Sequence, residues 1–126
     1  MVDFATSVRN FGTEALRGVK RVRDEAAIAV LQEASRPESA GGRMPVASGR
    51  LRDSITVNGT SGVRQISGAV EGVRLNTRII AEWDSDYAVA VEYGANGNRP
   101  AAFARSASAR WEQYIQRAAA KELRRR

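Results

Sequence analysis

The chain has 126 residues, 43% of them hydrophobic, and a formal net charge of +6 at pH 7. This length suits one domain with a modest core. Cysteine and histidine are both absent, so most nucleophile–base pairs and most zinc sites cannot be built. No apolar run approaches the roughly 18 residues of a membrane span, and the first residues lack the apolar region of an export signal. We therefore expect neither a membrane segment nor export by that route.

The positive charge is carried almost entirely by arginine, because Lys20 and Lys121 are the only lysines among 20 cationic residues. Arginine suits planar, bidentate contacts with carboxylates and phosphates. Two interpretations follow from this charge. The basic residues form either a solvated surface or a surface that faces a polyanion or an acidic protein.

The first 36 residues are predicted to form one long amphipathic helix, over Val2 to Ser35. Its apolar residues recur in steps of three and four, which places them in one stripe: Phe4, Val8, Phe11, Ala15, Val19, Val22, Ala26 and Val30. The helix ends before Pro37, because the residue preceding a proline is pushed out of the α region. A helix of about 50 Å is longer than a small domain covers. Its stripe therefore packs either on the domain's own sheet or, in part, on a neighbouring subunit.

Residues 37–48 are predicted to form a flexible loop, since Pro37 to Ala47 contains prolines and glycines without any hydrophobic period. We expect this loop to be mobile in the isolated protein and to become ordered when an inter-subunit contact forms. Ser48 follows as the predicted N-cap of a short helical turn that buries Leu51.

A small antiparallel meander of about three strands is predicted next, because the hydrophobic period changes to two. The first strand is Ile55–Val57, and Asn58-Gly59 after it is a strong hairpin signal. The second and third strands are predicted at Val63–Val70 and Thr77–Trp83. The apolar residues of the third strand share one face: Ile79, Ala81 and Trp83.

Helices return in the last third of the chain. The sequence Asp84-Ser85-Asp86 ends the strand and caps Tyr87 to Tyr93, for which a short helix is favoured over a strand. A closing helix is predicted from Pro100 to Arg126. Its apolar stripe comprises Ala107, Trp111, Tyr114, Ile115 and Ala118, and its basic residues Arg110, Arg117, Lys121 and Arg124 lie together beside that stripe. The predicted fold is a single α+β domain over residues 1–126, in which residues 49–126 supply the sheet and the C-terminal helix.

Three features of the sequence are candidates for reactive or ligand-binding sites. Glu82, Asp84 and Asp86 offer oxygen ligands for Mg²⁺ or Ca²⁺, but their spacing matches no metal loop and favours a polar strand end. Glu92 in an apolar segment is a candidate general base, although pairing with an arginine is the more common role. The loop from Gly94 to Gly97 precedes a helix but lacks the spacing of a phosphate-binding motif. We therefore predict no enzyme, no cofactor and no metal.

Three separated motifs together resemble the neck and tail-completion family of long-tailed bacteriophages, relatives of the lambda minor tail protein Z. Residues 45–55, PVASGRLRDSI, resemble the pattern P-V-x-T/S-G-x-L-x-x-S-I. Tyr87-Ala88 followed by residues 91–94, VEYG, resembles Y-A-x-x-V-E-F/Y-G. Arg99-Pro100 and Phe103 lead into the final helix as in the family. The chain departs from the family at residues 102–107, AFARSA, where P-F-L-R-P-A is frequent.

The resemblance implies a structural virion protein at the phage head–tail junction, made in the host cytoplasm and without catalytic activity. Such proteins assemble as rings around the DNA path, for which a hexamer is one candidate. Their neighbours are head-closure and tail-terminator or tail-tube proteins. A small basic nucleic-acid-binding module and a tail terminator remain as alternatives, and we expect no membrane or small-molecule partner.

The residues predicted to contact another subunit or partner are Pro37, Met44, Pro45, Leu51, Tyr87, Tyr93 and Phe103. The residues predicted to face packaged DNA, without reading its sequence, are Arg110, Arg117, Lys121 and Arg124.

Overall fold

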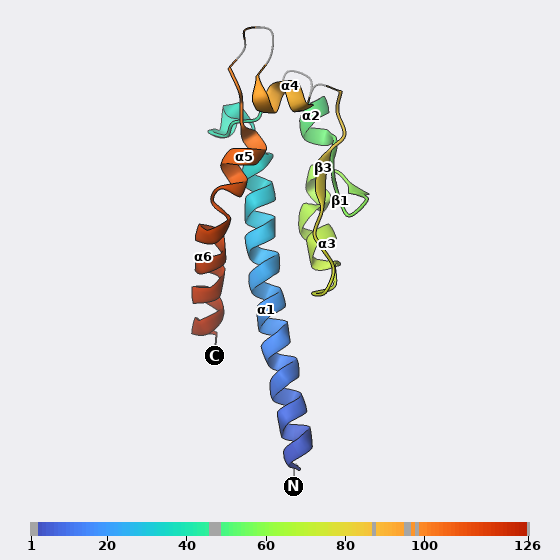
Figure 1. The fold of residues 1–126 in the computed structure, drawn as a ribbon, viewed down its shortest axis with the longest axis vertical. Helices are drawn as coiled ribbons and strands as arrows, with labels where there is room; N and C mark the ends of the chain where they lie inside the picture. Colours follow the sequence, from blue (N-terminus) through green and yellow to red (C-terminus); the bar gives the residue numbers. More distant parts are fainter. Residues whose placement is uncertain (1–2, 46–48, 87, 95–96, 98, 126) are drawn as a thin grey trace.

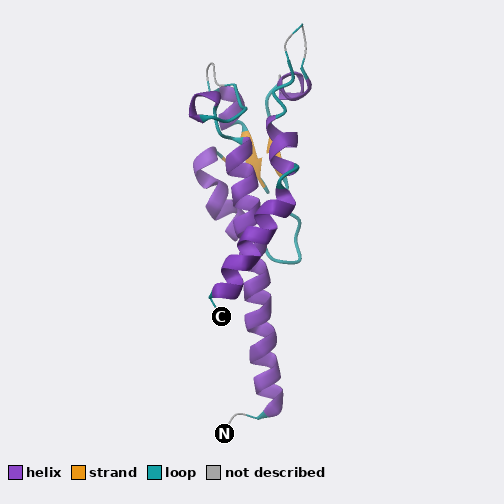
Figure 2. Ribbon diagram, turned by 90° about the vertical axis from the view of Figure 1, so that its left-hand side faces the viewer, coloured by secondary structure: helices purple, strands orange, loops and turns teal. Residues whose placement is uncertain are grey.

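The computed structural model describes residues 3–45, 49–86, 88–94, 97 and 99–125. Within them the fold is α+β, as predicted. The elements in chain order are α1 (Phe4–Ala34), η1 (Glu38–Ala40), α2 (Arg50–Asp53), β1 (Ile55–Val57), β2 (Thr60–Ser61), η2 (Val63–Gln65), α3 (Ile66–Glu71), β3 (Ala81–Trp83), α4 (Ala88–Tyr93), α5 (Phe103–Ser108) and α6 (Trp111–Arg124). Helix α1 is the axis of the molecule, with α5 and α6 along one side and α3 with the small sheet along the other (Figure 1). Figure 2 shows that the strands lie beside the upper half of α1, while its lower half extends alone.

Helix α1 confirms the predicted N-terminal helix and has defined caps at both ends. Asp3 accepts a hydrogen bond from the backbone N–H of Thr6 at 2.8 Å, which satisfies one of the free donors of the first turn. At the other end the N–H of Ser35 donates to the carbonyl of Leu31 at 3.0 Å, and the chain then leaves the helix before Pro37.

The described part of the predicted flexible loop, residues 37–45, forms a hydrogen-bonded turn, and its mobility stays a prediction. The N–H of Glu38 donates to the carbonyl of Met44 at 3.0 Å, and the N–H of Met44 donates to the carbonyl of Arg36 at 3.2 Å. Met44 is fully buried. A Cβ at Gly42 would lie 2.0 Å from the carbonyl oxygen of Arg36, so only glycine fits this turn. Residues 46–48, including the predicted N-cap Ser48, lie outside the described residues.

The sheet is a three-stranded antiparallel one with the order β2-β1-β3. The hairpin predicted at Asn58-Gly59 is confirmed, since both residues adopt positive φ, 46° and 85°. The third strand is shorter than predicted and begins at Ala81. The residues just before β3, which were predicted as part of the strand, bond instead to the side chain of Asn58. This side chain donates to the carbonyl of Arg78 at 2.8 Å and accepts from the N–H of Ile80 at 2.7 Å.

The predicted second strand, Val63–Val70, is wrong, because this segment forms η2 and α3. Its apolar residues Val63, Ile66 and Val70 are three and four residues apart, which is the helical period. Ile66 and Val70 are buried against α1 and β1. The strand that follows the hairpin and pairs with β1 is β2, which comprises just Thr60 and Ser61.

The predicted closing helix is two helices, α5 and α6, separated at Ala109 and Arg110. Arg110 has φ −97° and ψ 9°, outside the helical region. The break allows Phe103 and Ala107 of α5 to be buried at the upper end while α6 lies against α1. The short helix favoured for residues 87–93 is confirmed over Ala88–Tyr93, and Tyr87 lies outside the described residues.

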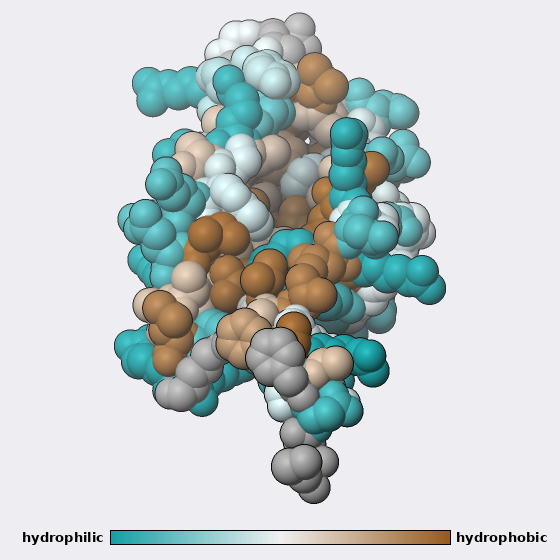
Figure 3. Space-filling model, turned by 60° about the horizontal axis from the view of Figure 1, so that its bottom comes forward, coloured by the Kyte–Doolittle hydropathy of each residue, from teal (hydrophilic) through white to brown (hydrophobic). Residues whose placement is uncertain are grey.

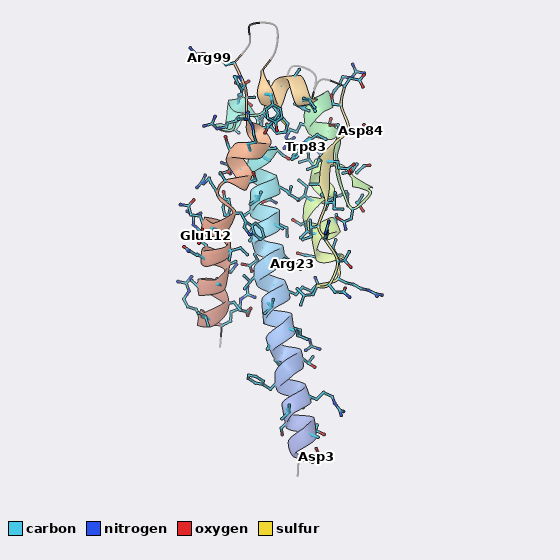
Figure 4. All side chains as sticks on the ribbon, viewed as in Figure 1. Asp3, Arg23, Trp83, Asp84, Arg99 and Glu112 are labelled. Carbon is cyan, nitrogen blue, oxygen red and sulfur yellow. The ribbon has the colours of Figure 1, made fainter. Side chains whose placement is uncertain are left out.

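Two apolar clusters share the interior. The lower one joins α1, β1 and α3 through Ala27, Leu31, Ile55, Val57, Ile66 and Val70. The upper one consists of Met44, Leu51 and Phe103. Trp83 packs on both clusters, and its ring meets that of Phe103 edge to face, with centroids 5.1 Å apart. Figure 4 places Trp83 between the sheet and the upper helices. The predicted shared face of Ile79, Ala81 and Trp83 packs on the lower cluster, which confirms it.

Candidate functional site

The three motif segments of the sequence come together at one end of the molecule. We call this region the motif end and define it as residues 36–45, α2, α4 and α5 (Figure 1). Leu51 from the first motif and Phe103 from the third meet in the upper cluster, and Val91 from the second packs against it. The motif residues therefore build the interior of this end.

Glu92 of the second motif holds the start of α5 by its carboxylate. Its two oxygens accept from the backbone N–H groups of Ala104 at 3.0 Å and Arg105 at 2.8 Å. The Arg105 side chain lies over the ring of Tyr93 at 4.2 Å and donates to the Glu92 carboxylate and carbonyl. Glu92 is 7% exposed, and the predicted pairing with an arginine is confirmed. These contacts give Glu92 a structural role, because an anion is favourable at a helix N-terminus.

Three of the predicted contact residues are interior residues in this fold. Met44, Leu51 and Phe103 are 0%, 2% and 3% exposed, so their side chains have no surface to offer a partner. The burial predicted for Leu51 is confirmed, and the assignment of all three side chains to a partner contact is corrected, because they build a core. Among the other predicted contacts, Pro37 and Pro45 are half-buried, Tyr93 is exposed, and Tyr87 lies outside the described residues.

The three acidic residues in and after the third strand do not form one cluster. Glu82 and Asp84 are exposed, and Asp84 and Asp86 border a small depression together with Arg50. Figure 4 shows Asp84 at the outer edge of the molecule. Among the described residues no group of three or more carboxylates is close enough to hold a metal ion. The geometry thus favours the polar strand end.

Of the four predicted DNA-facing cations, Arg110 is the N-cap residue of α6 and the others lie on α6, and two of the four pair with carboxylates of α1. Arg110 pairs with Glu33, which also accepts from the Tyr114 hydroxyl at 2.9 Å. Lys121 lies 3.5 Å from the carboxylate of Glu25. The remaining two are Arg117, whose guanidinium lies 5.6 Å from the centre of the Tyr114 ring, and the exposed Arg124. Two of the four charges are therefore compensated by α1, and the DNA contact stays a prediction.

A basic pocket of about 440 Å³ lies between the end of α1, the folded loop and α5. Its charged lining consists of Arg36, Arg43, Arg110 and Glu33. Burial, followed by the hydrogen bond to Glu33, raises the pKa of the Tyr114 hydroxyl beside it. Sequence reasoning did not single out Arg36 or Arg43, because they lie 67 or more residues from Arg110 and only the fold brings them together.

The other end of the molecule is an unaccompanied length of α1. We call residues 4–19 the projecting segment. It extends about 24 Å beyond the body, as Figures 1 and 2 show. Its large apolar side chains are exposed: Val8 53%, Phe11 72%, Leu16 60% and Val19 55%. Figure 3 shows apolar side chains gathered around the base of this helix, where Leu123 of α6 is also 72% exposed. The stripe is thus uncovered over half of α1.

The body of α1 is firmly held where the projecting segment ends. Lys20 donates to the carbonyl of Glu71 at 2.8 Å, and Arg23 donates to the carbonyls of Val73 and Arg74 after α3. Figure 4 shows Arg23 reaching from α1 towards this loop. Arg21 makes a bidentate ion pair with Glu122 of α6, at 2.6 and 2.9 Å. The segment is therefore a continuation of a fixed helix.

An apolar groove of about 370 Å³ runs along the same helix, between α1, the chain before β3 and the start of α6. We call it the lateral groove. Its apolar lining is Ala27, Val30, Leu31, Ile79, Ala81 and Trp111, and its polar lining is Arg23, Thr77 and Arg78. The sequence predicted the apolar stripe of α1 but not this groove, since its walls come from three separate segments.

No helix in the described part of the chain has the length and apolar character needed to cross a membrane. No known protein family, characterised protein or solved structure matches the chain.

Proposed function

We propose that the chain is a structural protein of the head–tail junction of a long-tailed bacteriophage. Copies of it assemble as a ring around the DNA path and join connector proteins to tail proteins. The role requires surfaces for association, and the proposal includes no catalytic step.

The observation that carries the proposal is the division of the molecule into two unlike ends. The segments that carry the family resemblance form a packed interior around Leu51 and Phe103. The opposite end projects a helix whose apolar stripe the chain leaves exposed. A contiguous exposed apolar surface is the usual mark of a protein–protein interface. Repetition of such a contact around a ring makes the assembly far tighter than one contact alone.

Inactivation of the gene in a phage that encodes the chain tests this role. We expect electron micrographs of the lysate to show DNA-filled heads and finished tails that have not joined, and joining to be restored by the wild-type chain. Tails of uncontrolled length would indicate the tail-terminator alternative instead. Normal complete particles without the chain would contradict the proposal.

A basic nucleic-acid-binding module is the second candidate, and the basic pocket favours it. Arg36 and Arg43 are exposed there beside Arg110. A protein that contacts several phosphates loses about 10³-fold or more in DNA affinity between 50 and 200 mM salt. We expect the isolated chain to show weak DNA binding that the double variant Arg36→Ala/Arg43→Ala leaves nearly unchanged. Tight, salt-sensitive binding that this variant abolishes would favour the second candidate.

A further inference from the structure

Helix α1 supplies both a convex apolar surface and one wall of a concave apolar surface. Val8 and Val19 in the projecting segment and Val30 in the lateral groove are 11 residues apart, which places them on the same helix face. Because both surfaces belong to one continuous helix, the projecting segment cannot fold back into the groove of its own chain. From this geometry we infer that the projecting segment of one copy docks in the lateral groove of a second copy. The inference rests on the self-assembly in the proposed function and specifies its contact.

The size of the two surfaces fits a weak contact that a ring would repeat. The four exposed side chains of the projecting segment offer on the order of 400 Å² of apolar surface, so docking buries about 800 Å² from both partners, below the range of stable pairs. Each copy in a closed ring makes two such contacts, one by its segment and one by its groove. A single contact is therefore weak, and closure of the ring stabilises the assembly.

Charge favours this pairing over contact between the bodies of two copies. The projecting segment, residues 4–19, contains Arg9, Glu14 and Arg17 and so carries a net charge of +1, whereas residues 20–126 carry +6. Two bodies therefore repel each other more strongly than a body repels the nearly neutral projecting segment of another copy. Arg23 and Arg78 border the groove that receives it.

Such a contact is heterologous, because the two copies use different surfaces. Heterologous contacts generate closed rings when the rotation closes and open filaments when it does not. An isologous pairing of two projecting segments would instead stop at a dimer. The two arrangements predict opposite results when damaged copies are mixed.

The test uses three single variants of the full chain. Phe11→Asp damages the segment, and Trp111→Glu damages the groove at the first residue of α6, where an acidic residue suits the helix dipole. Val89→Asp on α4 is the matched control, since Val89 is 71% exposed and Phe11 72%. Circular dichroism and thermal melting check that each variant is folded.

Sedimentation analysis then follows the mean molecular mass while the protein concentration is raised from about 10 µM to about 1 mM. This range covers the dissociation constants expected for a weak contact of this size. We expect the mass of the wild-type chain and of Val89→Asp to rise with concentration. Phe11→Asp and Trp111→Glu should each associate at least tenfold more weakly. An equimolar mixture of these two should form dimers and nothing larger, because one variant keeps its groove and the other its segment.

A second measurement keeps the inference testable if Trp111→Glu is unstable. The chain has no cysteine, so Arg9→Cys beside the stripe and Arg78→Cys at the groove can be joined by a short bismaleimide. We expect cross-linked pairs from this mixture and few when Val89→Cys replaces Arg78→Cys.

A wild-type chain that stays monomeric at the highest concentration would overturn the inference. The inference would also be overturned if the mixture of Phe11→Asp and Trp111→Glu did not form dimers, or if Val89→Asp weakened association as much as they do. Cross-linking that is no stronger than with Val89→Cys would overturn it as well. These measurements use purified protein alone. If the purified copies do not associate in this way, the head–tail role is still decided by the electron micrographs. If the micrographs contradict the head–tail role, the contact between copies is still decided by these measurements.

Discussion

The motif end and the projecting segment present the same kinds of residue in opposite surroundings. Phe103 is 3% exposed and packs on Trp83, whereas Phe11 is 72% exposed on the projecting segment. The acidic residues differ in the same way: Glu92 is buried and bonded to α5, while Glu14 pairs with Arg17 at the surface. The comparison teaches that the motif residues maintain the fold, while the exposed apolar surface that we propose for association lies outside the motifs.

Truncation of the two phenylalanines gives the largest expected contrast. Phe103→Ala should lower the free energy of unfolding by about 3–5 kcal/mol, because it opens a cavity in the upper cluster. Phe11→Ala should change it by less than about 0.5 kcal/mol at low protein concentration, since an exposed side chain loses little packing. Urea denaturation of both variants measures the difference. A comparable loss in Phe11→Ala would mean that the segment packs on its own chain.

Removal of one charge at each end gives a smaller contrast. Glu92→Gln keeps the volume of the side chain but weakens its bonds to Ala104 and Arg105, and we expect a loss of about 1.5–3 kcal/mol. Arg17→Gln removes an ion pair whose side chains are 65% and 63% exposed, so less than about 0.5 kcal/mol should be lost. Thermal or urea unfolding measures both variants, and an equal loss of stability in Glu92→Gln and Arg17→Gln would refute the structural role of Glu92.

Amide hydrogen exchange sharpens the comparison within α1 itself. At low concentration, amides of residues 8–17 should exchange at least about tenfold faster than those of residues 24–34, because local opening costs less where no packing is lost. Raising the protein concentration should slow exchange in the projecting segment if another copy covers it. Uniform protection along α1 in the dilute monomer would contradict the contrast.

The smallest effect concerns the link between α6 and the end of α1. The pKa of Tyr114 is raised by burial and then by its bond to Glu33, so the unfolded chain releases this proton first. The stabilisation is therefore complete below the unfolded value of about 10 and is lost as pH rises through the folded value. Tyr114→Phe should cost about 1 kcal/mol at pH 7 and should reduce the fall in melting temperature above pH 10. A fall as steep as in the wild-type chain would exclude Tyr114 as its source.

Several local patterns were sufficient to predict structure. The apolar steps of three and four gave α1, Asn58-Gly59 gave the hairpin, and the arginine partner of Glu92 was anticipated. Other predictions failed where a local pattern suited two structures. Val63–Val70 has residues typical of strands, but the helical spacing of Ile66 and Val70 decided the outcome once α1 was there to cover them.

By itself the sequence determined where α1 and the hairpin form, since caps, turn residues and hydrophobic period act between near neighbours along the chain. It also determined that α1 carries an apolar stripe longer than a small domain covers. Only the tertiary structure decided that Met44 is buried, that the closing helix breaks at Arg110, and that Trp111 and Ile79 form a groove beside Val30. These outcomes depend on surfaces contributed by segments far apart in the chain, and burial of one apolar face requires all of them at once.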